Sequence, residues 1–269
     1  MTSPERGRAD MTDLVTRAAD ALQQCERDRV DREPLTDEFD GLDLAAAYAV
    51  QDEILRRRVS AGETVVGVKL GLTSRAKQQR MNVHAPLTGW LTDAMVLQAG
   101  VPIPQDRLIH PRAEPEIVFV LGAPLEGPGV TAATAMAAVD WVYGGVEIID
   151  SRYRDFRFTL PDVVADNASS ACFVTGPVGC RPEGIDLFLE ACLLEVDGVV
   201  VDSATGAAVQ GHPAEALALA ANDLARRGLR LEAGWIVLTG GMTDAVFTPP
   251  GVTVAAHFTS LGSLLIAGG

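Results

Sequence analysis

Two glutamates on either side of a proline form the clearest chemical pattern in the sequence. They are Glu114 and Glu116, in the stretch "RAEPEIVFV" at 112–120. Pro115 excludes a continuous helix through the pair, and residues two apart in an extended chain face the same side. The two carboxylates are therefore predicted to point together, where they repel each other unless a cation or protons neutralise them.

A third glutamate, Glu147, lies inside the apolar stretch "GGVEIID" at 144–150. A charge inside an apolar strand is costly unless it is paired or bound to a metal. Three carboxylates that converge on one spot would suit Mg²⁺ or Mn²⁺, which prefer hard oxygen ligands and keep water-filled positions for a substrate. Spacing alone also allows a solvent-exposed Glu-x-Glu pair, and an ion pair of Glu147 with Arg112 or Arg152.

The composition describes a folded chain of one large domain or two small ones. It has 269 residues, of which 48% are hydrophobic, and a formal net charge of −14. This length is sufficient for a sizeable core, and the acidic balance argues against DNA, RNA or an anionic membrane as the main partner. An anionic substrate would need local positive charge or a metal cation at its site.

The sequence further predicts a soluble protein of the cytoplasm. No apolar run reaches the length of a membrane span, and the charged N-terminus lacks the apolar centre of a signal peptide. The histidines show no spacing typical of a zinc site. The cysteines show no CxxC spacing, so reduced thiols are the simplest interpretation; they are Cys25, Cys172, Cys180 and Cys192.

Hydrophobic periodicity and turn residues predict helices followed by a region rich in strands. Strict alternation of strands and helices is absent, which argues against a doubly wound sheet. The predicted fold class is α+β: a small helical N-terminal part, residues 1–62, on a larger β-rich body, residues 63–269, as one functional unit. Helices are predicted at 12–28, 43–60, 74–81, 130–142 and 212–228. Strands are predicted in the β-branched start of 64–74, ahead of a glycine turn, and at 116–122, 144–150, 170–176, 192–206 (a hairpin), 234–240, 252–258 and 263–268.

Four motifs in the same order resemble the fumarylacetoacetate hydrolase superfamily. The similarity runs over residues 44–266, and the branch resembled contains the 2-oxopent-4-enoate hydratases and 2-oxohex-3-enedioate (4-oxalocrotonate) decarboxylases of aromatic meta-cleavage pathways. It implies a mixed, barrel-like β-roll with a helical N-terminal portion. The motifs are "GVKLGLTS" (67–74), "EPEIVFVLG" (114–122), "VEIIDSRY" (146–153) and "LPDVVADNASS" (160–170).

The resemblance assigns roles to several side chains. It implies that the three glutamates bind Mg²⁺ or Mn²⁺, that a lysine and a serine are catalytic, and that three further residues contact the substrate. From residue type alone, the lysine could instead be a surface lysine whose stem crosses a strand edge, and the serine could cap a turn. The implied set is Glu114, Glu116 and Glu147 for the metal, Lys69 and Ser169 for catalysis, and Leu72, Thr73 and Leu87 for the substrate.

One position separates the two activities of this branch. Hydratases usually carry an aspartate after the proline of a "GVxxPDFG"-like segment, whereas "NVHAPLTGW" at 82–90 has Leu87 there. Hydration needs a general acid or base, but decarboxylation needs only an electron sink, and an apolar wall suits the departing carboxylate. The resemblance therefore favours a decarboxylase that converts 2-oxohex-3-enedioate into 2-hydroxypenta-2,4-dienoate and CO₂.

Other functions remain open at this point. They are a hydratase, an acylpyruvate-type C–C hydrolase, and a non-catalytic subunit. The hydrolase would need a His–acid pair to activate water, and none stands out, although His84 is close by; the intact glutamates and lysine argue against the non-catalytic subunit. The loop arginines Arg152, Arg154 and Arg157 could recognise the distal carboxylate of the substrate or be simply solvated. The expected partners are a small 2-oxo acid substrate, a 2-oxopent-4-enoate hydratase in a complex, and further copies of the chain in a homo-oligomer.

Overall fold

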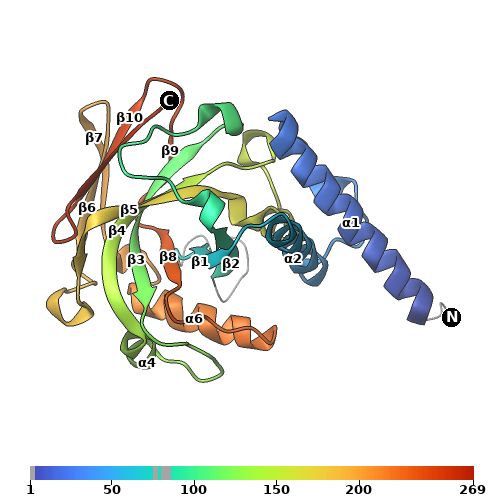
Figure 1. Ribbon diagram of the computed structural model, residues 1–269, viewed down its shortest axis with the longest axis horizontal. Coiled ribbons are helices and arrows are strands. Elements are labelled where there is room, and N and C mark those ends of the chain that lie inside the picture. Colours follow the sequence, from blue (N-terminus) through green and yellow to red (C-terminus); the bar gives the residue numbers. More distant parts are fainter. Residues whose placement is uncertain (1–3, 75–77, 80–85) are drawn as a thin grey trace.

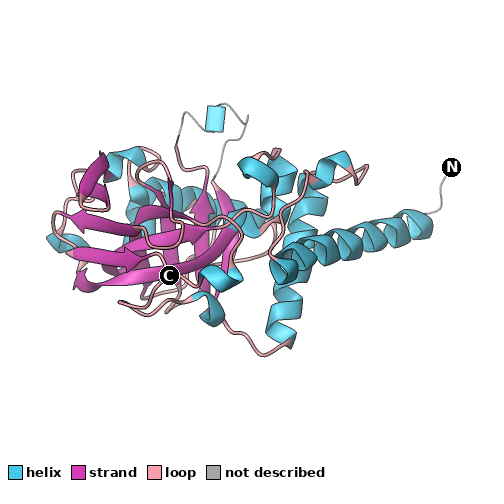
Figure 2. Cartoon of the chain, turned by 90° about the horizontal axis from the view of Figure 1, so that it is seen from above, coloured by secondary structure: helices cyan, strands magenta, loops and turns pink. Residues whose placement is uncertain are grey.

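The computed structural model describes residues 4–74, 78–79 and 86–269. The two predicted N-terminal helices are α1 (Pro4–Asp28) and α2 (Leu44–Ser60). Asp43 caps α2, because its side chain accepts a hydrogen bond from the backbone N–H of Ala46, as aspartate favours at this position. Helix α1 projects from one side of the molecule, and α2 lies between it and the β-rich body (Figures 1 and 2).

The helical part is not built from the first 62 residues alone. An apolar cluster joins Leu22 of α1 and Val50 of α2 to Tyr153 and to Val163 of the short helix α5 (Leu160–Ala165). The proposed boundary at residue 62 lies in the turn after α2, but this packing continues across it. None of the helices in the described part of the chain is both long and apolar enough to cross a membrane.

The larger sheet is mixed and rolls up on itself. Its strand order is β2-β1-β8-β3-β4-β5, with β9 beside β3, and only β1 and β8 pair in parallel. Leu91 of β2 and Phe173 of β5, from the two ends of this order, meet Val118 and Leu238 in one cluster inside the roll. The strands are β1 (Val65–Gly71), β2 (Leu87–Thr92), β3 (Arg112–Leu121), β4 (Val139–Ile149), β5 (Ser170–Cys180), β8 (Ile236–Gly241) and β9 (Val246–Phe247).

A smaller antiparallel sheet and two helices cover the roll. The order of this sheet is β11-β10-β6-β7, and the predicted hairpin turns at Asp197 and Gly198, both with positive φ, as a type I′ turn requires. Its inner face packs against β4 and β5 in the main core. These elements are β6 (Ala191–Val196), β7 (Val199–Thr205), β10 (Thr253–Phe258), β11 (Ser263–Ala267), α4 (Ala132–Ala137) and α6 (Pro213–Arg226).

The α+β prediction of a mixed β-roll with a helical N-terminal part is confirmed, but one predicted helix is wrong in its second half. Helix α4 ends at Ala137, and residues 139–142 open the long strand β4 instead. Trp141 pairs there with Val120 of β3, so pairing with a neighbouring strand overrides the local helical pattern. The predicted helix 74–81 lies mostly outside the described residues, as does His84.

Candidate metal centre and active site

Strand β3 begins earlier than predicted, so the glutamate pair lies inside the strand. Glu114 and Glu116 share a strand face with Val118, which belongs to the apolar cluster inside the roll. Pro115 is accommodated because β9 pairs with β3 only up to Ala113 and β8 pairs with it from Glu116 onward. The proline therefore occupies the gap between two partner strands and costs no ladder hydrogen bond there.

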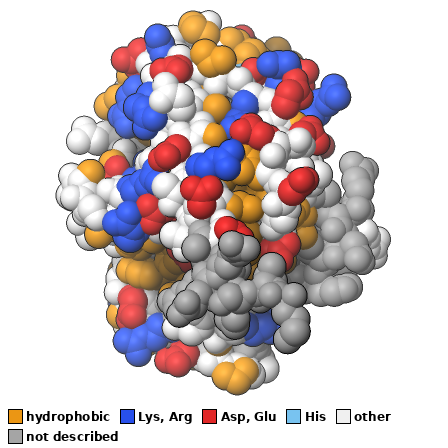
Figure 3. All heavy atoms as spheres, turned by 90° about the vertical axis from the view of Figure 1, so that its right-hand side faces the viewer, with side chains coloured by type: hydrophobic (Ala, Val, Ile, Leu, Met, Phe, Trp, Pro, Cys, Tyr) orange, Lys and Arg blue, Asp and Glu red, His pale blue; other side chains and the backbone are white. Residues whose placement is uncertain are grey.

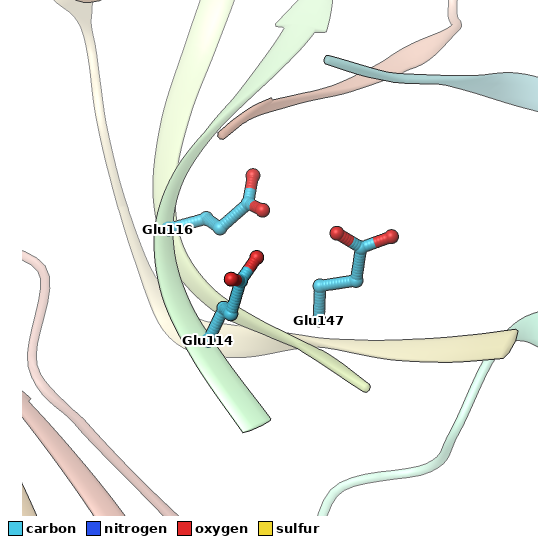
Figure 4. Close-up of side chains that lie close together, drawn as sticks. All are labelled: Glu114, Glu116 and Glu147. Atoms are coloured by element: carbon cyan, nitrogen blue, oxygen red, sulfur yellow. The ribbon is translucent and has the colours of Figure 1, made fainter. Parts of the chain in front are cut away.

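Strand β4 brings the third glutamate to the same place. Glu147 lies directly opposite Glu114 in the antiparallel register. Ligand oxygens of Glu114, Glu116 and Glu147 lie within 4.8 Å of one another, and the three side chains point toward a common space (Figure 4). Like charges opposite each other destabilise a sheet, so this register is costly unless positive charge compensates it.

Burial makes the glutamate cluster suited to a hard cation. Glu116 and Glu147 are fully buried. One oxygen of Glu116 accepts a hydrogen bond from the backbone N–H of Gly240 at 2.6 Å, whereas its Oε1 accepts none from the described residues. A buried carboxylate oxygen without a donor is costly. Carboxylate oxygens are the ligands that Mg²⁺ and Mn²⁺ prefer, so the donor set fits such an ion.

Two glycines at the end of β8 give the cluster its room. Gly240 has a φ of +109°, and a Cβ there would lie 2.0 Å from Oγ1 of Thr73. A Cβ on Gly241 would lie 3.0 Å from the carboxylate of Glu114. Only glycine fits at 240, and a side chain at 241 would push the Glu114 carboxylate out of its place. The pair is visible in the sequence as "TGGM" (239–242), but only the sheet order brings it beside Glu116.

Lys69 of β1 supplies positive charge to the cluster. Its Nζ lies 3.0 Å from Oε2 of Glu147 and donates to the backbone oxygen of Ala168 at 2.9 Å. Burial alone would lower the pKa of Lys69, but the three carboxylates outweigh it, so the pKa lies above its ordinary value of 10.5. Lys69 is therefore a buried ammonium ion, and the surface-lysine alternative is wrong.

The cluster still carries more negative than positive charge. Burial raises the pKa of Glu116 well above its ordinary value of 4.5, the charge of Glu147 raises it further, and Lys69 only partly opposes them. Without a divalent cation, the folded protein therefore holds a proton at the cluster more tightly than an exposed glutamate would. A metal ion would take the place of that proton.

Ser169 lies in a strained turn beside Lys69. Asn167, Ala168 and Ser169 all have positive φ, of 51°, 51° and 58°, a region that non-glycine residues rarely adopt. Neighbouring contacts hold the turn: the side chain of Asn167 bonds both the N–H and the C=O of Trp90, and Ser169 Oγ donates to Asp166 at 3.3 Å. The turn aims the Ala168 carbonyl at Lys69.

The arginines near the cluster do not pair with Glu147. Arg152 is buried and pairs with Asp166, and the guanidinium of Arg112 lies over the ring of Phe156, 3.9 Å from its centroid. Both ion-pair alternatives for Glu147 are therefore wrong. Glu147 instead accepts a hydrogen bond of 2.7 Å from Ser170, a residue whose only signal in the sequence is the double serine that ends "DNASS".

A pocket of about 120 Å³ adjoins the glutamates. Of the predicted residues, Glu116 and Glu147 are fully buried beside it, and the others line it: Lys69, Leu72, Thr73, Leu87, Glu114 and Ser169. The loop after β4 contributes aromatic rings, Phe156 and Phe158, which the sequence analysis did not identify. Neither Arg154 nor Arg157 is among the described residues that line it.

The rolled sheet is shared with known proteins. A fumarylacetoacetate hydrolase from Exiguobacterium antarcticum superposes with a TM-score of 0.59 at 14% sequence identity, over 77% of this chain and 76% of that one. At this identity the likeness shows the fold alone. No protein-family model matches the chain. The fold of the chain is thus that of the fumarylacetoacetate hydrolase class.

More similar relatives narrow this class to one family. The chain is 42% identical over 252 residues to a 4-oxalocrotonate decarboxylase of Pseudomonas sp. (strain CF600), covering 94% of this chain and 96% of the relative. It is also 42% identical over 215 residues to a 2-hydroxyhexa-2,4-dienoate hydratase of Comamonas testosteroni, covering 79% and 81%. The chain belongs to this family of decarboxylases and hydratases.

A solved structure in the family has the same architecture throughout. The 4-oxalocrotonate decarboxylase from Pseudomonas putida G7, complexed with magnesium and adipate, superposes with a TM-score of 0.92 at 41% identity. The match covers 95% of this chain and 97% of that chain. The family resemblance inferred from the four sequence motifs is confirmed.

Proposed function

We propose that this chain decarboxylates 4-oxalocrotonate (2-oxohex-3-enedioate) to 2-hydroxypenta-2,4-dienoate and CO₂, with Mg²⁺ as its cofactor. The observation that carries this choice within the family is the apolar end of the pocket. Leu87, the first residue of β2, is 4% exposed and lines the pocket together with Lys69. Phe158 and Val163 extend the same apolar wall.

This apolar wall favours loss of a carboxylate over addition of water. A carboxylate against this wall is poorly solvated, whereas neutral CO₂ needs no solvation. The wall therefore favours the state after the bond has broken over the bound substrate. A hydratase needs a general acid or base at the carbon that takes up water. The described residues of the wall, Leu87, Phe158 and Val163, offer no such group.

The glutamates and Lys69 would stabilise the electrons that the broken bond releases. Glu114, Glu116 and Glu147 would hold Mg²⁺, which, when bound, supplies a Lewis acid for the 2-oxo group. The bond between C5 and the C6 carboxylate breaks, and its electron pair moves through the conjugated system to the 2-oxo oxygen, which then takes up one proton. Lys69, fixed by Glu147 and the Ala168 carbonyl, would stabilise the negative charge that develops there.

Ser169 has a smaller role in this proposal. Its hydroxyl already donates to Asp166, and its φ of 58° is imposed by the turn that carries Ala168. We assign it to orienting that turn and to contact with the substrate carboxylate. Leu72 and Thr73, which line the pocket at the end of β1, would contact the substrate chain.

A direct assay tests the proposed reaction. Purified protein with Mg²⁺ is given 4-oxalocrotonate, and the loss of its ultraviolet absorbance is followed together with CO₂ release. Release of one CO₂ for each substrate consumed supports the proposal. A hydratase is the second candidate, since a hydratase is among the relatives; consumption of 2-hydroxypenta-2,4-dienoate alone would support it and overturn the decarboxylase.

Leu87→Asp tests the residue on which the choice rests. The new carboxylate would face the departing one, so decarboxylation should fall by about a hundredfold, the scale of a lost electrostatic contribution in an active site. Leu87→Met keeps the wall apolar at similar volume and should retain most activity. Equal loss in both variants would show that Leu87 acts only through packing.

The proposed product also suggests a partner. A 2-oxopent-4-enoate hydratase would consume the dienoate, so a complex of the two enzymes would shorten the transfer between them. Co-purification of the two proteins at micromolar concentration tests that association, and the mass of the isolated chain tests the predicted homo-oligomer.

A further inference from the structure

A second and larger pocket, of about 340 Å³, lies between the N-terminal helices and the start of β5. It shares no lining residue with the pocket beside the glutamates. Its volume is of the size that small ligands occupy. The wall carries five basic side chains, from α1, the residue after it, α2, the short 3₁₀ helix Gln105–Arg107 and the loop after β4: Arg27, Arg29, Arg58, Arg107 and Arg152.

The five arginines form a basic site on a chain that is acidic overall. The formal net charge is −14, and on the face that carries the N-terminal helices basic and acidic side chains lie side by side (Figure 3). Arg57 of α2 illustrates that pattern, because it pairs with both Glu53 and Asp20. Five arginines around one pocket, against three acidic residues, form a local excess of positive charge.

Two of those three acidic residues are already engaged. Glu26 places both carboxylate oxygens 3.0 Å from Arg58, and one of them lies 3.8 Å from Arg152. Asp150 accepts the backbone N–H groups of Ile109 and His110 at 2.9 and 2.7 Å. Glu26 is therefore shared between two arginines, and both oxygens of Asp150 are occupied by backbone N–H groups.

Arg29 and Arg107 are left without partners. Neither side chain forms a hydrogen bond or an ion pair with another described residue, although the backbone N–H of Arg107 donates to Pro104. The charge of Arg107 reaches Cys172, which also lines the pocket. Burial raises the pKa of Cys172 to about 12, and the charge of Arg107 opposes that rise. The two guanidinium groups therefore border the same space with their donors unused.

From this arrangement we infer a binding site for a compact dianion, a phosphate or a small dicarboxylate, distinct from the metal-centred pocket. Guanidinium groups bind both anions through paired, charge-assisted hydrogen bonds. Arg29 and Arg107 supply the unused donors at the rim, and Arg58 and Arg152, already held by Glu26, supply a fixed positive wall. The inference does not depend on the reaction proposed above.

Calorimetric titration of the Mg²⁺-loaded protein with inorganic phosphate, and separately with succinate, tests the site. The variant Arg29→Met/Arg107→Met removes the two unpartnered guanidinium groups, both exposed, and should keep the fold. The matched control, Arg226→Met/Arg230→Met, removes the same charge from side chains that are 78% and 50% exposed and lie outside the pocket.

We expect the pocket variant to bind at least one of the two anions tenfold or more weakly, about the effect of losing charged hydrogen bonds, and the control to bind as the wild type. Loss for phosphate alone assigns a phosphate site, and loss for succinate alone a dicarboxylate site. Equal binding by all three proteins, or equal weakening in both variants, overturns the inference. A change of oligomeric mass in the pocket variant alone would also overturn it, since the arginines would then contact another copy of the chain.

Discussion

Two buried charged groups lie on either side of the turn Asn167–Ser169, and they differ in how completely their atoms are paired. Asp166 receives hydrogen bonds from the backbone N–H and the guanidinium of Arg152 and from the hydroxyl of Ser169. The glutamate cluster holds three carboxylates against the single ammonium of Lys69, and Oε1 of Glu116 accepts no hydrogen bond from the described residues.

The difference in pairing indicates a structural role for the Asp166 group and a ligand-binding role for the glutamate cluster. A buried carboxylate whose two oxygens both accept hydrogen bonds holds the chain in place, and Asp166 anchors a turn of unfavourable φ in this way. A buried cluster with an unpaired oxygen and excess charge is costly until a ligand completes it. The two groups are connected, since Ala168 in the turn accepts the hydrogen bond of Lys69. Substitutions should therefore affect mainly activity in one group and mainly stability in the other.

Glu116→Gln should give the largest effect, and on activity alone. Loss of a metal ligand removes several kcal/mol of transition-state stabilisation, so turnover of 4-oxalocrotonate should fall by about a thousandfold or more. The free energy of unfolding of the metal-free protein should not fall, because the variant relieves repulsion with Glu147. Steady-state kinetics measures turnover, magnesium titration measures the metal affinity, which should fall with the lost ligand, and urea unfolding measures stability.

The control for this variant is Glu126→Gln, at a glutamate whose side chain is 63% exposed. It should leave turnover and metal affinity unchanged. Retained metal-dependent turnover in Glu116→Gln would contradict the metal assignment, and a large loss of stability would show that Glu116 is structural.

Asp166→Asn should act mainly on stability. Removing one partner of a buried pair costs about 3–5 kcal/mol, because Arg152 would keep only the more distant carboxylate of Glu26, at 3.8 Å, as an ion-pair partner. Asp140→Asn is the matched control, because it breaks an aspartate–arginine pair whose partners are 45% and 55% exposed, and should cost under about 1 kcal/mol. Urea unfolding measures the loss of stability in both variants. Equal losses of unfolding free energy would contradict the distinction between the two buried groups.

The members of the glutamate cluster differ in how far the sequence alone could predict them. The glutamate cluster was partly predictable because Glu114 and Glu116 are local in the chain and two-residue periodicity places them on one face. The apolar stretch around Glu147 made it a third candidate, but the family motifs were needed to add Lys69 and to favour the metal site over the alternatives, since nothing local relates β4 or β1 to β3. The partners that complete the cluster, Ser170 and the backbone of Gly240, depend on strand register and were missed.

The errors have a common physical origin. The stretch 130–142 has a helical pattern, but pairing with β3 draws Trp141 into a strand. Arg152 was considered a partner of Glu147 because it follows closely in sequence, yet the chain turns after β4 and brings it to Asp166. In both cases a contact between distant segments outweighs a local preference.

Lys69→Met separates charge at the reacting end from metal binding. Turnover should fall by about a hundredfold, because a preorganised positive charge is lost where negative charge develops. Magnesium affinity should rise, since the remaining carboxylates lose the cation that competes for them. Lys69→Arg keeps the charge and should bind magnesium as the wild type does. A parallel fall of turnover and magnesium affinity in Lys69→Met would instead make Lys69 a support of the metal site.

The smallest effect concerns pH and follows from the raised pKa of Glu116. As pH rises above 4.5, the metal-free folded protein binds more protons than the unfolded chain until the raised pKa is passed, so its stability falls over that range. Magnesium replaces the proton, so the rise of Tm on adding magnesium should grow with pH in the wild type and stay flat in Glu116→Gln. Thermal unfolding at a series of pH values, with and without magnesium, measures it. A magnesium effect independent of pH in the wild type would mean that Glu116 is ionised in the metal-free cluster, with Lys69 sufficient to neutralise it.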